Sequence, residues 1–278
     1  MSTYCMNPFK LTEENGGHLV PCSKCLNCKR RRTSAWSVRL VKEGERSNSA
    51  LFVTLTYDTQ FIPITKNGFM NLSKTDLQKF FKRLRKCHEN VSDAKSIKYY
   101  ACGEYGGKTK RPHYHIVLFN ANAEYVNRAW ALNNKSIGNI HIGEVSEASI
   151  GYTLKYISKA SQIPMHKNDD RQKEFSLMSK KLGNNYLTEA MIAWHKAIPS
   201  ERVYIPLKDG KKAPMPRYFK EKLYTPEEKE EIAYYFQQKA VLQLEKELEE
   251  YGDNWLKTKT EQYLNGNRKL KINYSDKI

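Results

Sequence analysis

The amino-acid sequence predicts an α+β fold, in which a mostly antiparallel central sheet has helices flanking one face and is followed by a helical C-terminal extension. Strand-like and helix-like segments alternate between residues 46 and 165 in the order β-α-β-β-α-β-α. Two of these strands are separated only by a turn rich in glycine and lysine, which is typical of an antiparallel hairpin. After a polar, proline-marked region, a long charged helix begins at Thr225.

The pattern begins with a basic helix at residues 24–43, which ends at Gly44. Residues 51–57 are rich in β-branched and aromatic side chains and predict a strand. Ser73 begins the next helix, with Asp76 three residues later as in a capping box, and apolar residues follow at helical spacing. This second helix is therefore amphipathic, with a basic outer face.

Two further strands are predicted at residues 97–102 and 113–119, joined by the turn at residues 106–110. A helix, a strand and a helix complete the order, at residues 123–132, 140–145 and 147–160. Beyond Ser161 the pattern weakens until the capped helix of residues 225–251. We therefore expect a cysteine-rich basic segment, a core domain and a basic linker with a helical extension, at residues 1–45, 46–165 and 166–278.

Lysine and arginine outnumber aspartate and glutamate by 47 to 30, which gives a net charge of +17. An excess of this size attracts polyphosphates through counterion release, so nucleic acid is the expected partner. The positive charge is clustered, as a binding surface requires. The candidate DNA-binding residues are Lys29, Arg30, Arg31, Arg32, Lys82, Arg83, Arg85, Lys108, Lys110 and Arg111, and a further basic stretch covers residues 208–222.

No apolar leader opens the chain, and no run of residues approaches the roughly 20 apolar side chains needed to span a bilayer. The mean hydropathy is -0.73. The six cysteines lie among abundant lysines, and a chain of this length needs no disulfides to fold. We therefore expect a cytoplasmic protein without a membrane partner.

His113 and His115 are two residues apart on a predicted strand, so both imidazoles point to one face of the sheet. Glu104 closes the preceding strand, nine residues before His113, and a hairpin would bring its carboxylate beside the histidines. Two imidazoles and one carboxylate can hold a divalent metal ion and leave positions open for water and phosphate oxygens. Taken alone, the pattern also fits a pair of structural or exposed histidines.

Tyr152 and Tyr156 are four residues apart on a predicted helix and therefore share a face. Each is followed three residues later by a lysine, Lys155 and Lys159. A phenol with a pKa of about 10 is a weak nucleophile at neutral pH and needs help from an ammonium group or a metal ion. Either lysine could also stabilise charge on a phosphate or protonate a leaving oxygen. Taken alone, the pattern also fits an amphipathic helix that buries two aromatic rings.

These segments resemble the motifs of the HUH endonucleases. Residues 112–115, Pro-His-Tyr-His, resemble the histidine motif, and residues 152–159 resemble the tyrosine motif in its two-tyrosine form. The strand at residues 52–57 resembles the remaining, less specific motif. One departure is Tyr114, because the family has an aliphatic residue between its two histidines.

The N-terminal segment narrows the resemblance to the replication initiator proteins of the microviruses, in particular the gokushovirus type. Their recurrent pattern has a proline, three cysteines at regular spacing, arginines and then a tryptophan. It is matched here by Pro21, Cys22, Cys25, Cys28, Arg30 and Trp36. The resemblance covers roughly residues 5–160.

The resemblance implies an HUH fold with a ferredoxin-like or RRM-like sheet and the activity of a rolling-circle replication initiator. His113, His115 and Glu104 would bind Mg2+ or Mn2+, and two imidazoles favour Mn2+ slightly. Tyr152 and Tyr156 would nick single-stranded origin DNA, each forming a 5'-phosphotyrosine and leaving a 3'-hydroxyl primer. The displaced strand would then be rejoined into a circle without ATP. Because no Walker A loop is found, a host helicase would unwind the DNA, and a host polymerase would extend the primer.

The cysteines at positions 22, 25 and 28 are too regular in spacing to ignore. Cys5 could supply a fourth thiolate for tetrahedral zinc, and His18 is the other candidate for that position. An iron-sulfur cluster would also use three or four cysteines, and free thiols in a DNA-facing helix are the simplest alternative. We expect structural zinc at Cys5, Cys22, Cys25 and Cys28.

Three other functions fit parts of the sequence. A conjugative relaxase or a transposase shares the tyrosine chemistry but acts on different DNA. A non-catalytic single-strand binder could use the same sheet topology, as RNA-recognition modules do, but has no use for the histidine pair or the paired tyrosines and lysines. A metal nuclease that activates water would leave no covalent adduct with DNA.

Overall fold

The computed structural model describes residues 5, 7–15, 17, 19–89, 95–158, 161 and 163–275. The chain divides into two compact units, one built on residues 27–188 and the other on residues 5–26 and 189–278. The predicted division into three functional parts stays a prediction. Within the described part of the chain, no helix combines the length and the apolar character needed to cross a membrane.

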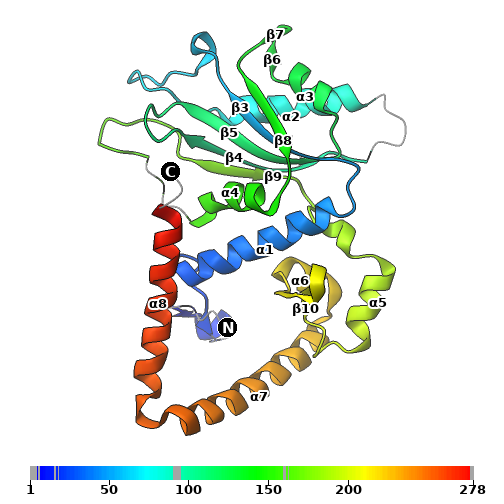
Figure 1. Ribbon diagram of the computed structural model, residues 1–278, viewed down its shortest axis with the longest axis vertical. Helices are drawn as coiled ribbons and strands as arrows, with labels where there is room; N and C mark the ends of the chain where they lie inside the picture. Colours follow the sequence, from blue (N-terminus) through cyan, green and yellow to red (C-terminus); the bar gives the residue numbers. More distant parts are fainter. Residues whose placement is uncertain are drawn as a thin grey trace. The chain divides into compact units, whose positions relative to one another are not determined.

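The first unit is built around a five-stranded sheet, in which every neighbouring pair of strands is antiparallel. The strands lie in the order β8-β3-β5-β4-β9 (Figure 1). Their bounds are β3 Ala50–Thr56, β4 Lys98–Tyr105, β5 Pro112–Phe119, β8 Ile140–Glu144 and β9 Phe175–Met178. The predicted α+β fold and the four predicted strands are confirmed. The edge strand β9 was not predicted, because it is short and lies in the polar region beyond Ser161.

Helices cover both faces of this sheet, so the expectation of helices on one face only is wrong (Figure 1). The four helices are α1 Leu26–Gly44, α2 Lys74–His88, α3 Ala123–Ala129 and α4 Glu147–Ser158. Along β5, Tyr114, Ile116 and Leu118 pack in the core with α2 and α3. Val117 and Phe119 point the other way and pack with α1 and α4. Because both sets are fully buried, each face of the sheet needs its own apolar cover.

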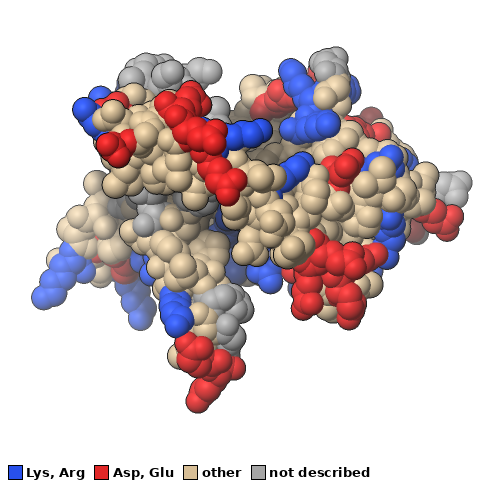
Figure 2. Space-filling model, turned by 90° about the horizontal axis from the view of Figure 1, so that it is seen from below, with Lys and Arg blue, Asp and Glu red and all other residues tan. Residues whose placement is uncertain are grey.

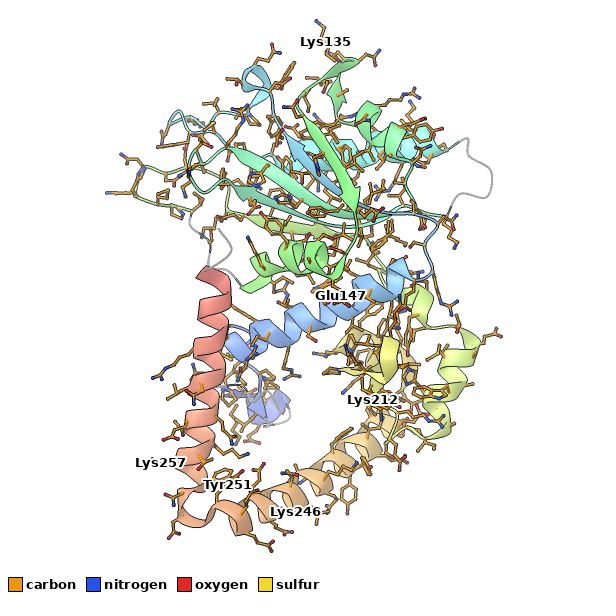
Figure 3. The ribbon with its side chains drawn as sticks, in the orientation of Figure 1. Lys135, Glu147, Lys212, Lys246, Tyr251 and Lys257 are labelled. Carbon is orange, nitrogen blue, oxygen red and sulfur yellow. The ribbon has the colours of Figure 1, made fainter. Side chains whose placement is uncertain are left out.

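The capping residue predicted for α2 is confirmed. The Asp76 backbone N–H donates to the Ser73 hydroxyl oxygen at 3.1 Å. The helix predicted at residues 123–132 ends earlier, at Ala129, where the Trp130 side chain turns into the core and its indole N–H donates to the Thr56 carbonyl at 2.8 Å. A small hairpin of β6 (Ala131–Leu132) and β7 (Lys135–Ser136) follows, and Figure 3 shows the Lys135 side chain pointing away from the sheet.

Short elements complete the first unit and open the second. They are the 3-10 helices at Glu13–Asn15, Thr59–Phe61 and Asn184–Tyr186, and the two-stranded ribbon of β1 (Phe9–Lys10) and β2 (Leu19–Val20). The ribbon belongs to the second unit.

The second unit is mainly helical. It contains α5 Glu189–Ala197, β10 Tyr204–Pro206, β11 Lys212–Pro214, α6 Arg217–Leu223, α7 Pro226–Tyr251 and α8 Trp255–Ser275, with 3-10 turns at Lys208–Gly210 and Gly252–Asn254. The predicted capping box is confirmed, since Thr225 and Glu228 each bond the other's backbone N–H. α7 ends at Tyr251, as predicted. The bend between α7 and α8 lies between Tyr251 and Lys257 (Figure 3).

Candidate active site

Glu104, His113 and His115 meet on the face of the sheet that α1 and α4 cover. Glu104 is the register partner of His113 in the β4–β5 hairpin, and His115 lies two residues further along β5. The Nε2 atoms of His113 and His115 lie 3.0 Å and 2.8 Å from the same oxygen, Glu104 Oε1. The structure therefore brings the three predicted ligands together, with ligand atoms within 4.8 Å of one another.

The other nitrogen of each imidazole has a partner that fixes the ring. His113 Nδ1 lies 3.1 Å from the Arg111 carbonyl oxygen, and His115 Nδ1 lies 3.0 Å from the Thr54 hydroxyl. A carbonyl oxygen can only accept, so Nδ1 of His113 carries the proton, and in the neutral ring Nε2 presents a lone pair. Such a partner is typical of a metal-binding histidine.

These three side chains fit a divalent cation. A lone pair on Nε2 of His113 would face the Glu104 carboxylate with nothing between them unless a proton or a cation is present. The Nε2 atom of His115 is buried and has no hydrogen bond of acceptable geometry in the described structure, although it lies 2.8 Å from that carboxylate. Ligand atoms about 2.1 Å from one ion in adjacent octahedral positions lie about 3.0 Å apart, which is close to both observed distances.

The electrostatics of Glu104 also suit a cation. Burial raises the pKa of this carboxyl group, but hydrogen bonds and charge from His113 and His115 outweigh that effect and lower its pKa to about 2. Glu104 is therefore ionised at any physiological pH, although only 4% of the residue is exposed. A buried carboxylate of this kind is stable only with positive charge beside it.

Tyr152 reaches the same carboxylate from α4. Ile150 and Leu154 are buried in the core on this face and anchor the helix against the sheet. The Tyr152 hydroxyl donates to Glu104 Oε1 at 3.2 Å, and its ring lies edge-on to that of His115 with centroids 4.9 Å apart. Because 39% of Tyr152 is exposed, a DNA strand can reach its hydroxyl from solvent.

Lys155 contacts Tyr152, but through the ring. Its ammonium nitrogen lies 4.1 Å from the ring centroid, in a cation-π contact. Burial and the negative charge of Glu104 raise the pKa of the Tyr152 phenol well above its usual value. The resting phenol is therefore protonated. The Tyr156 side chain and Lys159 lie outside the described residues.

The predicted DNA-binding residues fall in three places. Lys29 to Arg32 lie in the first turns of α1, Lys82 to Arg85 on α2, and Lys108 to Arg111 in the turn between β4 and β5. The α2 group lies on the opposite face of the sheet from the histidines, so the structure does not bring all three groups together. Figure 2 shows acidic as well as basic side chains on the face it displays, so the cationic excess is unevenly distributed.

Two of these arginines also have structural contacts. Arg83 Nε donates to the Ala129 carbonyl at 2.7 Å, which ties α2 to α3, and burial lowers the pKa of its guanidinium. Arg111 donates to the Tyr57 carbonyl at 2.6 Å, while its own carbonyl holds His113.

The sequence analysis missed two residues that support the site. Thr54, in the strand of the less specific motif, is the register partner of His115 and contacts its ring. Tyr114, which departs from the family pattern, points to the opposite face from the histidines. Its hydroxyl lies 2.9 Å from that of Tyr57 and accepts from the Ser73 N–H at 2.8 Å. The departure is therefore accommodated by a hydrogen-bond network at the start of α2.

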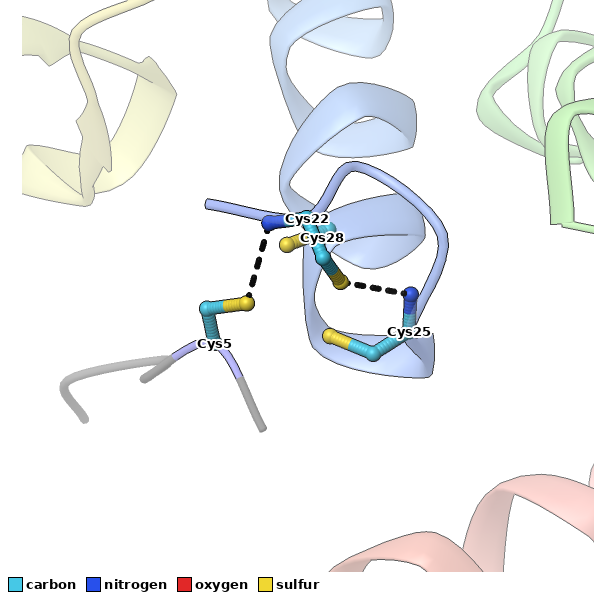
Figure 4. A group of neighbouring side chains, drawn as sticks. All are labelled: Cys5, Cys22, Cys25 and Cys28. Carbon is cyan, nitrogen blue, oxygen red and sulfur yellow. Dashed lines mark hydrogen bonds between the residues drawn. The ribbon is translucent and has the colours of Figure 1, made fainter. Parts of the chain in front are cut away.

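The four cysteines of the N-terminal pattern also meet (Figure 4). Their sulfur atoms lie within 4.8 Å of one another, and all four residues have free thiols: Cys5, Cys22, Cys25 and Cys28. Backbone N–H groups of Cys25 and Lys24 lower the pKa of the Cys22 thiol to about 6. The alternative ligand His18 lies outside the described residues. Of the remaining cysteines, Cys102 is buried and Cys87 is half-buried.

Comparison with known proteins assigns the family. Residues 50–161, which contain all the predicted metal ligands and Tyr152, match the family model of the ORF2-type replication-associated proteins. The replication-associated protein ORF2 of Spiroplasma virus 4 is 30% identical over 238 residues, covering 79% of this chain and 71% of the relative. The chain belongs to the replication-associated proteins of microvirus-type phages.

Other members of the replication-associated family are more distant. The replication-associated protein VP4 of Bdellovibrio phage phiMH2K is 25% identical over 233 residues, covering 76% of this chain and 70% of the relative. The replication-associated protein ORF4 of Chlamydia phage 1 is 24% identical over 225 residues, covering 73% of this chain and 53% of the relative. No solved structure matches the chain.

Proposed function

We propose that this protein is an HUH endonuclease that nicks single-stranded origin DNA in the cytoplasm of the bacterial host and so starts rolling-circle replication. The observation that carries the proposal is the position of Tyr152. Its hydroxyl donates to the same carboxylate oxygen, Glu104 Oε1, on which His113 and His115 converge. A nucleophile and a group of metal ligands therefore share one exposed site.

In the proposed reaction the Tyr152 oxygen attacks the scissile phosphorus. A bond forms between phosphorus and the phenolic oxygen, and the bond between phosphorus and the 3'-oxygen breaks. Glu104 is placed to receive the phenol proton, although its pKa of about 2 and the raised pKa of Tyr152 oppose that transfer in the resting site. A Mg2+ or Mn2+ ion held by the three ligands would supply the positive charge that favours the phenolate and neutralises the phosphate oxygens.

The products fit a role in replication. The DNA retains a free 3'-hydroxyl, which primes synthesis by a host polymerase, while its 5'-phosphate stays on the tyrosine. Tyr156, four residues later on the same helix, would act as the second nucleophile when the origin is regenerated. The 3'-hydroxyl released by that second cut then attacks the first phosphotyrosine and closes the displaced strand. Phosphodiester energy is conserved throughout, so joining needs no ATP.

The lysines and the basic surface complete the proposal. Lys155 and Lys159 would stabilise charge on the phosphate and return a proton to the leaving oxygen. The turn of Lys108, Lys110 and Arg111 leads directly into the strand of the histidines, so it is placed to contact DNA entering the site. Lys29 to Arg32 and Lys82 to Arg85 would extend the path of the DNA. A host helicase would unwind the duplex ahead of the site.

Cleavage of an origin-region oligonucleotide tests this proposal. We expect the wild-type protein to cut the single strand with Mn2+ but not with a chelator, and we expect His113→Ala and the double variant Tyr152→Phe/Tyr156→Phe to be inactive. Tyr125→Phe serves as a matched control, because Tyr125 lies on α3 on the opposite face of the sheet. Binding without cleavage by the wild type would support a single-strand binder instead. Full cleavage by the double variant would support a nuclease that activates water.

A further inference from the structure

The four-cysteine group lies outside the residues that match the family model and has no part in the proposed nicking reaction. Cys5 comes from the start of the described chain, and Cys22, Cys25 and Cys28 from the segment that leads into α1 (Figure 4). We infer that these four thiolates bind a single zinc ion that holds the N-terminal segment in its fold.

The spacing of the sulfur atoms favours one ion. Thiolates about 2.3 Å from a tetrahedral zinc ion lie roughly 3.8 Å apart, and the four sulfur atoms here all lie within 4.8 Å of one another. An iron-sulfur cluster places several metal and sulfide atoms between its cysteines and therefore separates them more widely. Disulfides are not formed by any of the four.

The backbone around the group resembles the surroundings of a metal thiolate. The Cys22 N–H donates to Cys5 Sγ at 3.1 Å, and the Cys25 N–H donates to Cys22 Sγ at 3.3 Å (Figure 4). A neutral thiol is a weak acceptor, whereas a metal-bound thiolate is a strong one. The turn that makes the second bond possible contains Ser23 in the left-handed region, at φ 59°. Four thiolates around Zn2+ carry a net negative charge, and Lys24 and Lys29 lie within the same short stretch of sequence.

The N-terminal segment also lacks another source of stability. None of its described residues from position 5 to 26 is buried. The ribbon of β1 and β2 has only two residues in each strand, and its Phe9 and Leu19 are exposed by 53% and 67%. A segment this small cannot fold on apolar burial alone and usually needs a metal or disulfides. The inferred zinc ion closes the chain from Cys5 to Cys22 and fixes the point from which the basic residues of α1 begin.

Metal analysis of the full-length protein tests this inference. We expect one zinc ion per chain after purification without chelator, no acid-labile sulfide, and retention of the zinc in His113→Ala, which alters only the other group. Cys25→Ser should lose most of the zinc, and Cys87→Ser, a half-buried cysteine on α2, should retain it. Because the readout is metal content, it is independent of nicking activity.

A second measurement covers the case in which Cys25→Ser does not fold. Cobalt(II) added to the reduced, metal-free wild-type chain should give the strong visible absorption of a tetrahedral thiolate site, which zinc then displaces. Zinc content unchanged by Cys25→Ser would overturn the inference, as would iron with labile sulfide, or a folded wild-type chain that binds neither zinc nor cobalt and has all four thiols reactive.

Discussion

Replacing Tyr114 with phenylalanine removes one hydroxyl from the core without creating a large cavity. That hydroxyl accepts from the Ser73 N–H at 2.8 Å, donates to the Ser73 carbonyl at 3.0 Å and lies 2.9 Å from the Tyr57 hydroxyl. The Ser73 carbonyl still accepts from the Leu77 N–H, and Tyr57 still donates to Asp76. The Ser73 N–H alone loses its partner, and an unsatisfied donor in a largely buried position costs about 2 kcal/mol.

Urea unfolding followed by circular dichroism measures this cost. We expect Tyr114→Phe to lower the free energy of unfolding of the sheet unit by about 2 kcal/mol without changing the slope with denaturant. Tyr99→Phe is the control, because the Tyr99 hydroxyl has no hydrogen bond among the described residues; a change below about 0.5 kcal/mol is expected there. Equal losses in the two variants, or no loss in Tyr114→Phe, would refute the role assigned to the network. Folded Tyr114→Phe should keep its metal-dependent activity, since its side chain faces away from His113.

Three further substitutions test other parts of the structure. Thr54→Val removes the hydroxyl that orients an imidazole of the metal group and should raise the Mn2+ concentration needed for half-maximal nicking roughly tenfold, whereas Thr54→Ser should not; equal requirements would contradict the role of the hydroxyl. Gly138→Ala would place a methyl group 1.8 Å from a backbone oxygen and should cost about 3 kcal/mol or prevent folding, whereas Gly107→Ala, with nothing within 4 Å, should be neutral in thermal unfolding. Thr225→Ala should cost about 1 kcal/mol by loss of the cap of α7, measured as lower helix content on heating; an unchanged profile would show that the cap is dispensable.

The parts of the site that could be predicted from the sequence are those set by local geometry. Strand periodicity places His113 and His115 on one face, and a short turn between two strands makes Glu104 the neighbour of His113. Helix spacing likewise relates Tyr152 to Tyr156, and capping residues mark the starts of α2 and α7. None of these relations depends on distant parts of the chain.

The parts that could not be predicted depend on pairing between distant segments. Thr54 contacts His115 across 61 positions of sequence, and the β3–β5 register that aligns them has no local signal. The edge strand β9 is short and partly exposed, so its sequence resembles a loop. The second helical layer could not be predicted either, because fully apolar strands fit burial on both faces only once their neighbours are known.

The contact made by Lys155 could not be predicted for a different reason. Helical spacing places the lysine near Tyr152 but does not determine its rotamer. In the structure its ammonium group lies over the ring, and the phenol hydroxyl is bonded to Glu104 instead. The expectation of direct help from the lysine in ionising the phenol is therefore not met in the resting site, and the positive charge must come from the metal group.

Mass spectrometry of the covalent product tests the central claim most directly. The protein is incubated with origin-region single-stranded DNA and Mn2+, denatured, and digested with protease and nuclease. We predict a peptide from α4 in which Tyr152 or Tyr156 carries a 5'-linked nucleotide phosphate, with loss of the Tyr152 adduct in Tyr152→Phe. Efficient cleavage of the same DNA with no phosphotyrosyl peptide, or a nucleotide linked through its 3'-phosphate, would contradict the account.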